Sequence, residues 1–196
     1  MKITMLTLLA LVQVPNAVLG KDFPGPPLTR ELKATMTAAD DAFQAERYRE
    51  AHRIYENDLV PMGDKYSQYL IGWMNVQGLG VHKDLVLGVA WLELAAERNH
   101  AKLSEVRDEV AVWLSTEEKQ KVPAQLEELR VQYGDCAVVK RLLAQDRELE
   151  PTVGTRLSGS SQPVTVIHGD LPGVKNVNNI RQRIRKREQY LREHCQ

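Results

Sequence analysis

The chain has 196 residues, and its 26 lysines and arginines balance 26 aspartates and glutamates, so the formal net charge at pH 7 is zero. This balance argues against a protein whose whole surface serves nucleic acid. A charged fraction of 27% and a mean hydropathy of -0.38 exclude a polytopic membrane protein. The length allows one domain, or one domain with an appendage.

Residues 1–20 have the pattern of a secretory signal peptide. Lys2 precedes an apolar stretch from Ile3 to Val14, and small residues follow up to Gly20. The apolar stretch is shorter than the roughly 20 residues that span a bilayer. We therefore expect cleavage near Gly20 and an exported protein, periplasmic or secreted, without a transmembrane segment after processing. A membrane anchor or a buried helix is the alternative.

Residues 21–28 contain three prolines, which resist helix formation and predict a short extended leader. Apolar residues at three- and four-residue spacing then predict two short helices over 37–47 and 48–57 that face each other. A second antiparallel pair is predicted over 66–76 and 85–98, because a glycine-bearing loop separates two apolar patterns.

The second pair carries a specific succession of residues. It reads Ser-Gln-Tyr-Leu-Ile-Gly-Trp-Met from Ser67, Gly-Leu-Gly-Val-His-Lys-Asp from Gly78, and Ala-Trp-Leu-Glu-Leu-Ala-Ala from Ala90. This stretch closely resembles one Sel-one-like repeat, a relative of the tetratricopeptide repeat. The glycines, the aspartate that opens the second helix, the tryptophan and the paired alanines stand at the spacing of that family.

The resemblance implies an all-α fold, a short α/α solenoid of antiparallel helix pairs over 29–150, with its clearest repeat at 64–101. Three residues depart from the family pattern: Asn75 replaces an aromatic residue, Gly88 replaces alanine, and Asn99 replaces the glycine that ends the second helix.

The resemblance also implies a binding role, since stacked helix pairs present an extended concave groove that suits a protein or peptide ligand. Candidate groove residues on the first helix of the repeat are Tyr66, Tyr69, Trp73 and Asn75. Simple packing between repeats is the alternative role for the three aromatic residues.

The helical pattern continues more loosely after Ala101. A capping box at 115–118 predicts the start of another helix, which Pro123 should kink or restart. Gly134 is predicted to end that helix, and Asp135 to start a further one. We expect this last helical run to cap the stack, because one or two repeats cannot bury their faces alone.

Composition changes after Glu150, so 151–196 is predicted to be a C-terminal extension. Residues 152–159 and 162–167 hold Thr, Val, Leu and Ile around a Gly-Ser-Ser turn, which predicts a β-hairpin. Residues 176–195 predict a final helix.

Charge is divided between these parts: residues 21–150 hold 17 basic and 23 acidic residues, whereas 151–196 hold 8 and 3. The final helix is rich in cations. In one interpretation it packs an incomplete apolar stripe on the acidic solenoid, with its arginines in water or paired with carboxylates. In the other it is a detachable arm for an anionic envelope surface. The candidate contacts are Arg181, Arg185 and Arg187.

The anionic candidates are lipid headgroups, cell-wall polymer or an acidic protein surface. Nucleic acid is not expected, because only Tyr190 offers an aromatic ring for stacking within the basic run.

Cys136 and Cys195 are the two cysteines of the chain. Two thiols in one small exported domain usually form a disulfide, which here would tie the last residues to the rest of the protein. Free thiols or an intermolecular bridge are the alternatives, since Cys195 lies beside a terminus that can fray.

The sequence contains no recognisable catalytic, cofactor or metal motif. Its five histidines form no HExxH or closely spaced carboxylate set, and no GxSxG motif is present. We therefore predict a non-enzymatic scaffold or adaptor without a cofactor, which mediates protein–protein interaction in the cell envelope. Two alternatives remain: a cell-envelope small-molecule binder or enzyme, and an anionic-surface-binding factor that acts through the basic C-terminal helix.

Overall fold

The structure is a computed structural model, and it describes residues 22–149 and 177–195. Within these residues every regular element is a helix, which confirms the predicted all-α class. The predicted signal peptide over 1–20 and the predicted β-hairpin over 152–167 lie outside the described residues. None of the described helices combines the length and the apolar character needed to cross a membrane.

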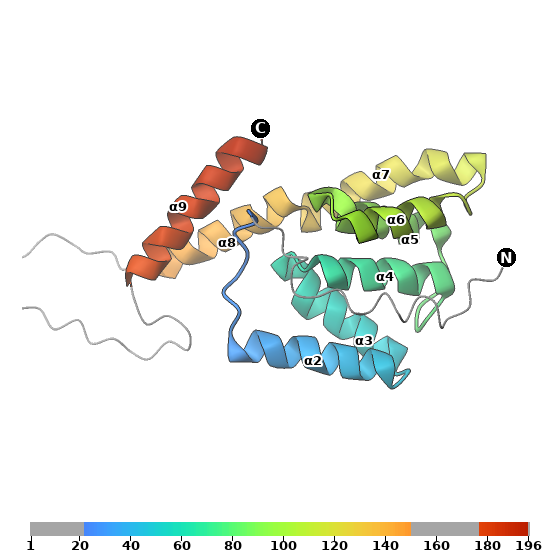
Figure 1. The fold of residues 1–196 in the computed structure, drawn as a ribbon, viewed down its shortest axis with the longest axis horizontal. Coiled ribbons are helices and arrows are strands. Elements are labelled where there is room, and N and C mark those ends of the chain that lie inside the picture. The colour runs from blue at the N-terminus through green and yellow to red at the C-terminus, as the bar shows by residue number, and fades with distance from the viewer. Residues whose placement is uncertain (1–21, 150–176, 196) are drawn as a thin grey trace, which may run out of the picture.

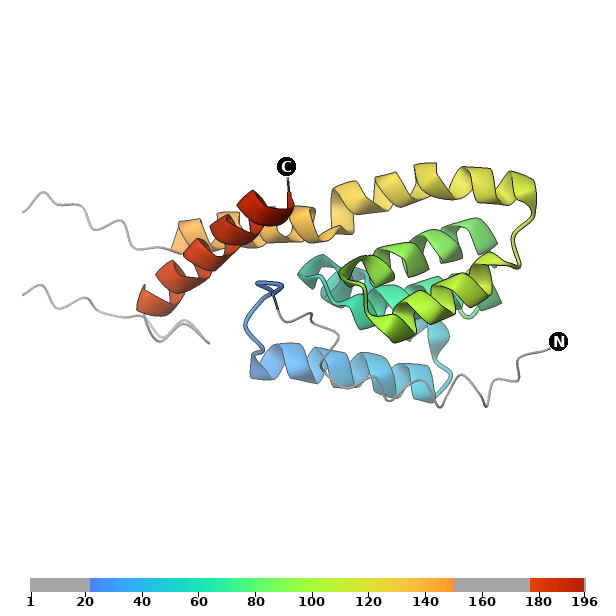
Figure 2. The ribbon, with the colours of Figure 1, turned by 45° about the horizontal axis from the view of Figure 1, so that its top comes forward.

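The helices form a body, made of α2 to α7, and a separate pair, α8 and α9, at one end of it (Figure 1). A second view shows α8 leading away from the end of α7 while α9 lies against α8 (Figure 2). In chain order the helices are α2 (Arg30–Gln44), α3 (Tyr48–Ile54), α4 (Lys65–Gln77), α5 (Leu85–Ala95), α6 (Ala101–Ala111), α7 (Thr116–Tyr133), α8 (Asp135–Leu149) and α9 (Val177–His194).

Helix α2 begins at Arg30, at the start of the predicted helical region 29–150 and about two turns before the apolar pattern at 37–47. Thr29 caps it, since its Oγ1 accepts a hydrogen bond from the backbone N of Leu32 at 3.1 Å. Helix α3 begins at Tyr48 as predicted. It continues through a π-helical turn, Tyr55–Leu59, and a short 3-10 turn, Val60–Met62.

Helices α4 and α5 form the predicted second pair. Both begin at an aspartate: Asp64 Oδ2 accepts from the backbone N of Ser67 at 3.0 Å, and Asp84 Oδ1 accepts from that of Leu87 at 2.9 Å. Gly78 ends α4 in the left-handed conformation, with φ 75°.

Close approach of α4 and α5 requires two glycines. A Cβ on Gly72 would lie 2.9 Å from the carbonyl oxygen of Gly88, and a Cβ on Gly88 would lie 2.6 Å from Cγ2 of Val76. The space therefore excludes the alanine that the resembled repeat usually carries at position 88.

Asn99 preserves the conformation of the residue that it replaces. It ends the short turn after α5 with φ 55°, in the left-handed region that the usual glycine would adopt. Asparagine is among the few other residues that tolerate this region, so the departure changes the side chain and keeps the turn.

Pro123 was predicted to kink or restart a helix, and the structure excludes the restart. Helix α7 begins at the predicted capping box, where Ser115 and Glu118 exchange hydrogen bonds, and is a single element through Pro123. Pro123 and Lys119, whose carbonyl loses its usual donor, are exposed. Water can therefore satisfy that carbonyl, and the helix tolerates the proline.

Two hydrophobic clusters stabilise the described chain. The larger one runs through α2 to α7 and includes the fully buried Leu92, Leu94 and Met74. The smaller one joins α8 to α9 through few side chains: Leu143, Ile180, Ile184 and the partly buried Leu191. The C-terminal pair therefore depends on other interactions for its position.

Candidate functional site

Asp146 on α8 binds two arginines of α9. Its Oδ2 accepts from Arg183 Nε at 3.0 Å and its Oδ1 from Arg183 Nη2 at 2.7 Å, while Arg187 Nη1 pairs with Oδ2. The side chains of Asp146 and Arg187 are almost fully buried. Because loss of one partner would leave a buried charge, this contact fixes the register of α9 on α8.

Arg187 lies in the interior, with 1% of its surface exposed, so this predicted partner-binding residue has a structural position. It donates to the carbonyl oxygens of Leu142 at 3.0 Å and of Pro24 and Gly25, both at 3.1 Å. Burial lowers the pKa of Arg187, and the charge of Asp146 opposes that shift. Arg187 thereby links α8, α9 and the leader, defined here as residues 22–28.

Phe23 in the leader joins the body to α9. The guanidinium of Arg98 lies over its ring, 3.5 Å from the centroid, and Tyr190 on α9 meets it edge to face at 5.8 Å. Gly63 leaves room for the ring, since a Cβ there would lie 2.9 Å from Phe23 Cζ. The leader carries no helix, as predicted, and packs between the two parts of the molecule.

A buried polar cluster lies where the body meets α8. Lys65 is fully buried; its Nζ donates to Gln68 Oε1 and to the carbonyl of Leu94, both at 3.0 Å, and pairs with Glu97 and with Asp135 at 3.2 Å. Sequence reasoning missed this cluster. Its local signal is a lysine in the first turn of a helix that contains no other charged residue.

Asp135 connects this cluster to α9. It accepts two hydrogen bonds from Arg98, at 2.8 and 2.7 Å, and one from the hydroxyl of Tyr190 at 3.2 Å. Burial raises the pKa of Asp135, but the hydrogen bonds from Arg98 and the charge of Lys65 outweigh it and hold the pKa well below its usual range. Burial raises the pKa of Glu97 and lowers that of Lys65.

A disulfide joins Cys136 to Cys195, which confirms the predicted pairing. The bond connects the first turn of α8 to the residue after α9, so the two helices run antiparallel. Together with the contacts of Asp146, Arg187 and Tyr190, it holds α9 against α8. The structure therefore agrees with the interpretation in which the final helix packs on the rest of the protein.

The four candidate groove residues on α4 do not form one accessible surface. Tyr69 and Asn75 are 3% and 5% exposed, and Asn75 Nδ2 donates to the carbonyl of Ile71 within the helix. Tyr66 and Trp73 are half-buried. The rings of Tyr66 and Tyr69 stack with centroids 6.3 Å apart, and burial raises the pKa of Tyr69 to about 12. Helix packing thus accounts for most of their surface.

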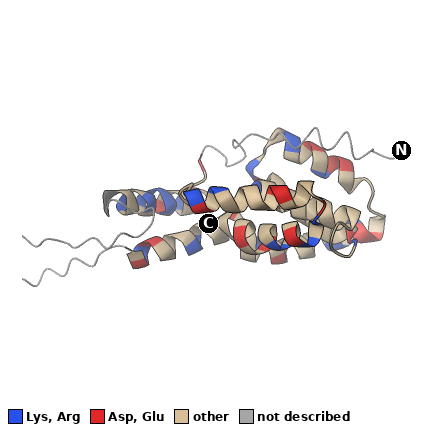
Figure 3. Cartoon of the chain, turned by 90° about the horizontal axis from the view of Figure 1, so that it is seen from below, with Lys and Arg blue, Asp and Glu red and all other residues tan. Residues whose placement is uncertain are grey.

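Helix α9 divides its cations between the interior and the surface. Arg183 and Arg187 face Asp146, whereas four others are exposed: Arg181, Arg185, Lys186 and Arg192. Basic residues accordingly gather along α9, while both signs of charge occur on the helices of the body (Figure 3). Two of the predicted contacts, Arg181 and Arg185, thus lie at the surface.

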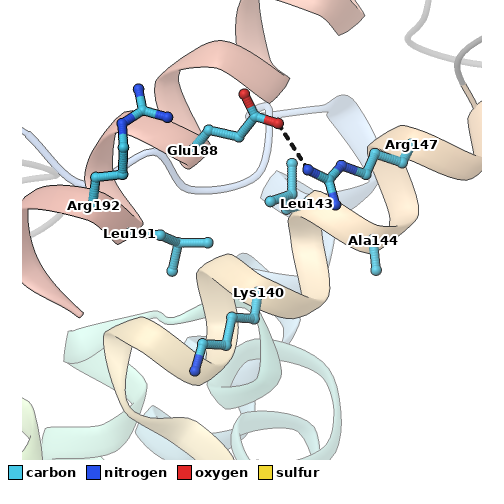
Figure 4. A pocket seen from close by; sticks show the side chains of 7 residues that line it. All are labelled: Lys140, Leu143, Ala144, Arg147, Glu188, Leu191 and Arg192. Carbon is cyan, nitrogen blue, oxygen red and sulfur yellow. Dashed lines mark hydrogen bonds and ion pairs between the residues drawn. The ribbon is translucent and has the colours of Figure 1, made fainter. Parts of the chain in front are cut away.

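An open groove of about 620 Å³ runs between α8 and α9. Its apolar residues are Leu143, Ala144 and Leu191, and basic side chains rise from both helices around them (Figure 4). The full lining is Lys140, Leu143, Ala144, Arg147, Glu188, Leu191 and Arg192. Arg147 Nη2 pairs with Glu188 Oε1 across the groove at 2.8 Å. The sequence could have indicated the α8 side of this groove, because positions 140, 144 and 147 lie on one face of a helix.

Within 22–149 and 177–195, no three His, Cys, Asp or Glu side chains are grouped so that they could hold a metal ion. Comparisons of the chain with protein-family models, with curated proteins and with solved structures find no match. The Sel-one-like resemblance therefore remains a prediction from the residues themselves.

Proposed function

We propose that this protein is an exported helical-repeat adaptor of the cell envelope, and that the outer surface of α8 and α9 is its binding surface for a protein partner. The observation that carries the proposal is a set of exposed cations on a helix that is fixed in place. Arg181, Arg185 and Arg192 are exposed, while separate residues dock the helix.

Rigid presentation favours recognition, because a preorganised surface loses little conformational freedom when it binds. The disulfide, the Asp146 contacts and the leader each restrain α9. This arrangement makes the detachable arm the weaker interpretation, since α9 would have to break a covalent bond and buried ion pairs to detach.

The packed pair α4 and α5 supports the repeat part of the proposal. The cap at Asp84 and the close approach at Gly72 are features that the Sel-one-like resemblance requires. The contact of α2 with α3 before this pair and the contacts of α6 and α7 with α5 after it are compatible with a short solenoid, whose stacked helices offer extended surfaces to partners. The predicted signal peptide and the disulfide both support export.

The test is cross-linking in cells followed by mass spectrometry of a tagged full-length chain. We expect reproducible protein partners that are lost in Arg181→Glu/Arg185→Glu and kept in Lys33→Glu/Lys119→Glu, which changes two exposed lysines of the body. Loss of partners on substitution of Tyr66 and Trp73 instead would move the binding surface to α4. Capture of no protein partner would contradict the adaptor proposal.

An anionic envelope surface is a second candidate partner, because positions 181, 185 and 192 follow one stripe of α9. Each basic residue near an anionic membrane contributes about 1 kcal/mol. Co-sedimentation should then detect binding to phosphatidylglycerol vesicles, no binding to phosphatidylcholine vesicles, and release by salt. Equal binding to phosphatidylglycerol and phosphatidylcholine vesicles would contradict an anionic envelope surface as the partner.

A further inference from the structure

The groove between α8 and α9 combines an apolar floor with a basic rim. Leu143 and Leu191 also belong to the small hydrophobic cluster, so the floor is continuous with the contact between the helices. Lys140 rises from α8 and Arg192 from α9 (Figure 4). Among the described residues that line the groove, the one carboxylate is Glu188, which pairs with Arg147. The groove therefore favours a ligand that is apolar at its centre and anionic at its sides.

The groove is a different surface from the one that the leader covers. Leader residues line depressions with Arg183, Lys186 and Arg187, none of which lines the groove. Two antiparallel helices with one covered side and one open side leave a position for a third helix. Neighbouring helix axes lie roughly 8–10 Å apart, so a third helix could contact both α8 and α9 along the seam.

We propose that the groove binds an acidic amphipathic helix of a partner protein. Aliphatic side chains of that helix pack on Leu143, Ala144 and Leu191, and its flanking carboxylates pair with Lys140 and Arg192. The inference deepens the proposed function and rests on it, because it assigns the partner chemistry and the site to the adaptor. The groove is concave and carries cations on both helices, so it matches carboxylates on both sides of one partner helix. A flat membrane would instead first contact the exposed outer side of α9.

Ala144 offers a substitution that tests the groove without disturbing the fold. It is exposed, its methyl group lines the groove, and glutamate is a good helix former. Ala144→Glu places a negative charge and added bulk on the floor. Gln145→Glu is the matched control, because it introduces one negative charge at the next exposed position of α8, which does not line the groove.

The probe is an acetylated, fluorescein-labelled peptide of about 18 residues, long enough to form a helix, with leucines at three- and four-residue spacing and glutamates beside them. Binding to the full chain is measured by fluorescence anisotropy. We expect micromolar affinity, as for small transient interfaces. Ala144→Glu should weaken the affinity for the peptide about tenfold, because the new carboxylate repels the glutamates of the peptide. Gln145→Glu should change this affinity less than about twofold. A lysine version of the peptide should not bind.

The outcomes separate this inference from the proposed function. Equal affinities of the Ala144→Glu and Gln145→Glu chains for the peptide, or no binding at all, would overturn the groove as the site. If cellular partners are then still lost in Arg181→Glu/Arg185→Glu, the adaptor proposal stands without the groove. If phosphatidylglycerol vesicles bind the chain and the peptide does not, the basic surface serves a membrane, and the inference fails. Groove binding without any cellular protein partner would support the site chemistry and contradict the adaptor.

Discussion

The body and the α8/α9 pair are stabilised by different kinds of interaction. The body has an extended apolar core that reaches from Ala39 to Leu129. The described residues of the pair bury six apolar side chains, of which only three form its own cluster, and the pair adds a disulfide, the Asp146 ion pairs and the contacts of Arg187 with the leader. Apolar burial is non-directional, whereas hydrogen bonds and ion pairs require defined geometry.

This difference links the stability of the C-terminal pair to the proposed function. Directional contacts fix one orientation of α9 although the apolar cluster between α8 and α9 is small, and they would present its exposed cations to the proposed partner in a defined arrangement. The same contacts make the pair sensitive to redox state, pH and single polar substitutions, whereas we expect the body to respond mainly to changes of volume.

The largest expected effect is removal of the disulfide. Its cysteines are 59 residues apart, which corresponds to about 4 kcal/mol in the chain-entropy model. Reductant, or Cys136→Ser/Cys195→Ser, should lower the free energy of unfolding by that amount, measured by urea denaturation. The double variant should not respond to reductant. An unchanged midpoint after reduction would show that the noncovalent contacts alone hold α9.

Leu92→Ala should destabilise the body by about 3 kcal/mol, because it leaves a cavity at a fully buried site. Urea denaturation with and without reductant should give the same difference from wild type, since Leu92 belongs to the larger cluster of the body and the disulfide ties α9 to α8. Leu28→Ala at an exposed leucine is the control. A strong dependence on redox state would mean that the two regions do not behave separately.

Asp146→Asn should weaken the α8/α9 pair by about 2 kcal/mol, less than the roughly 3–5 kcal/mol for a wholly unpaired buried charge, because Arg187 keeps its carbonyl partners. Hydrogen exchange should accelerate in α9 and stay unchanged in α4 and α5. Asp108→Asn, at an exposed aspartate, should have no such effect. Faster exchange in α4 and α5 as well would contradict a local role for Asp146.

The polar cluster predicts a pH dependence through Asp135. Its folded-state pKa is depressed, so the unfolded chain binds the proton more readily, and the stabilisation is present above about pH 4 and is lost as pH falls. Glu97 has the opposite effect on the pH dependence of stability, because its folded-state pKa is raised.

The test of this dependence is the destabilisation caused by Asp135→Asn, measured by urea denaturation across pH. We expect it to be about 1 kcal/mol smaller at pH 3 than at pH 6. A pH-independent difference would show that the charge of Asp135 contributes nothing at this junction.

The smallest effect is expected for Glu188→Gln, which removes the partly exposed ion pair with Arg147. Stability should change by less than about 0.5 kcal/mol. Removal of the only acidic side chain that lines the groove should raise the affinity for the glutamate peptide about twofold. Weaker peptide binding would instead mean that the pair between Arg147 and Glu188 shapes the groove.

Local rules predicted much of the body. The caps at Asp84 and Ser115 and the left-handed Gly78 each depend on a few neighbouring residues, and the structure has all of them. The same rules were incomplete where context decides: the apolar spacing over 37–47 missed the first two turns of α2, and Pro123 does not restart α7, because its surroundings are exposed. Apolar periodicity locates helices well and their ends poorly.

The candidate site was less predictable than the fold. Sequence marked α9 as basic, but it could not separate Arg187, which is buried, from Arg181 and Arg185, which are exposed. It also placed Tyr69 and Asn75 in a groove, whereas packing buries them. The groove itself needs Lys140 of one helix beside Arg192 of another.

By itself the sequence determined the location of the basic charge, and it predicted the helical class, the pairing of α4 with α5 and a disulfide between its two cysteines, because these predictions need only spacing, residue type and count. Only the tertiary structure decided which charges are buried. Arg187 donates to Pro24, 163 residues away, and Lys65 meets Asp135 across the junction of body and pair. Burial and pairing of such groups depend on distant segments that meet only in the folded chain, where a low dielectric makes each unpaired charge costly.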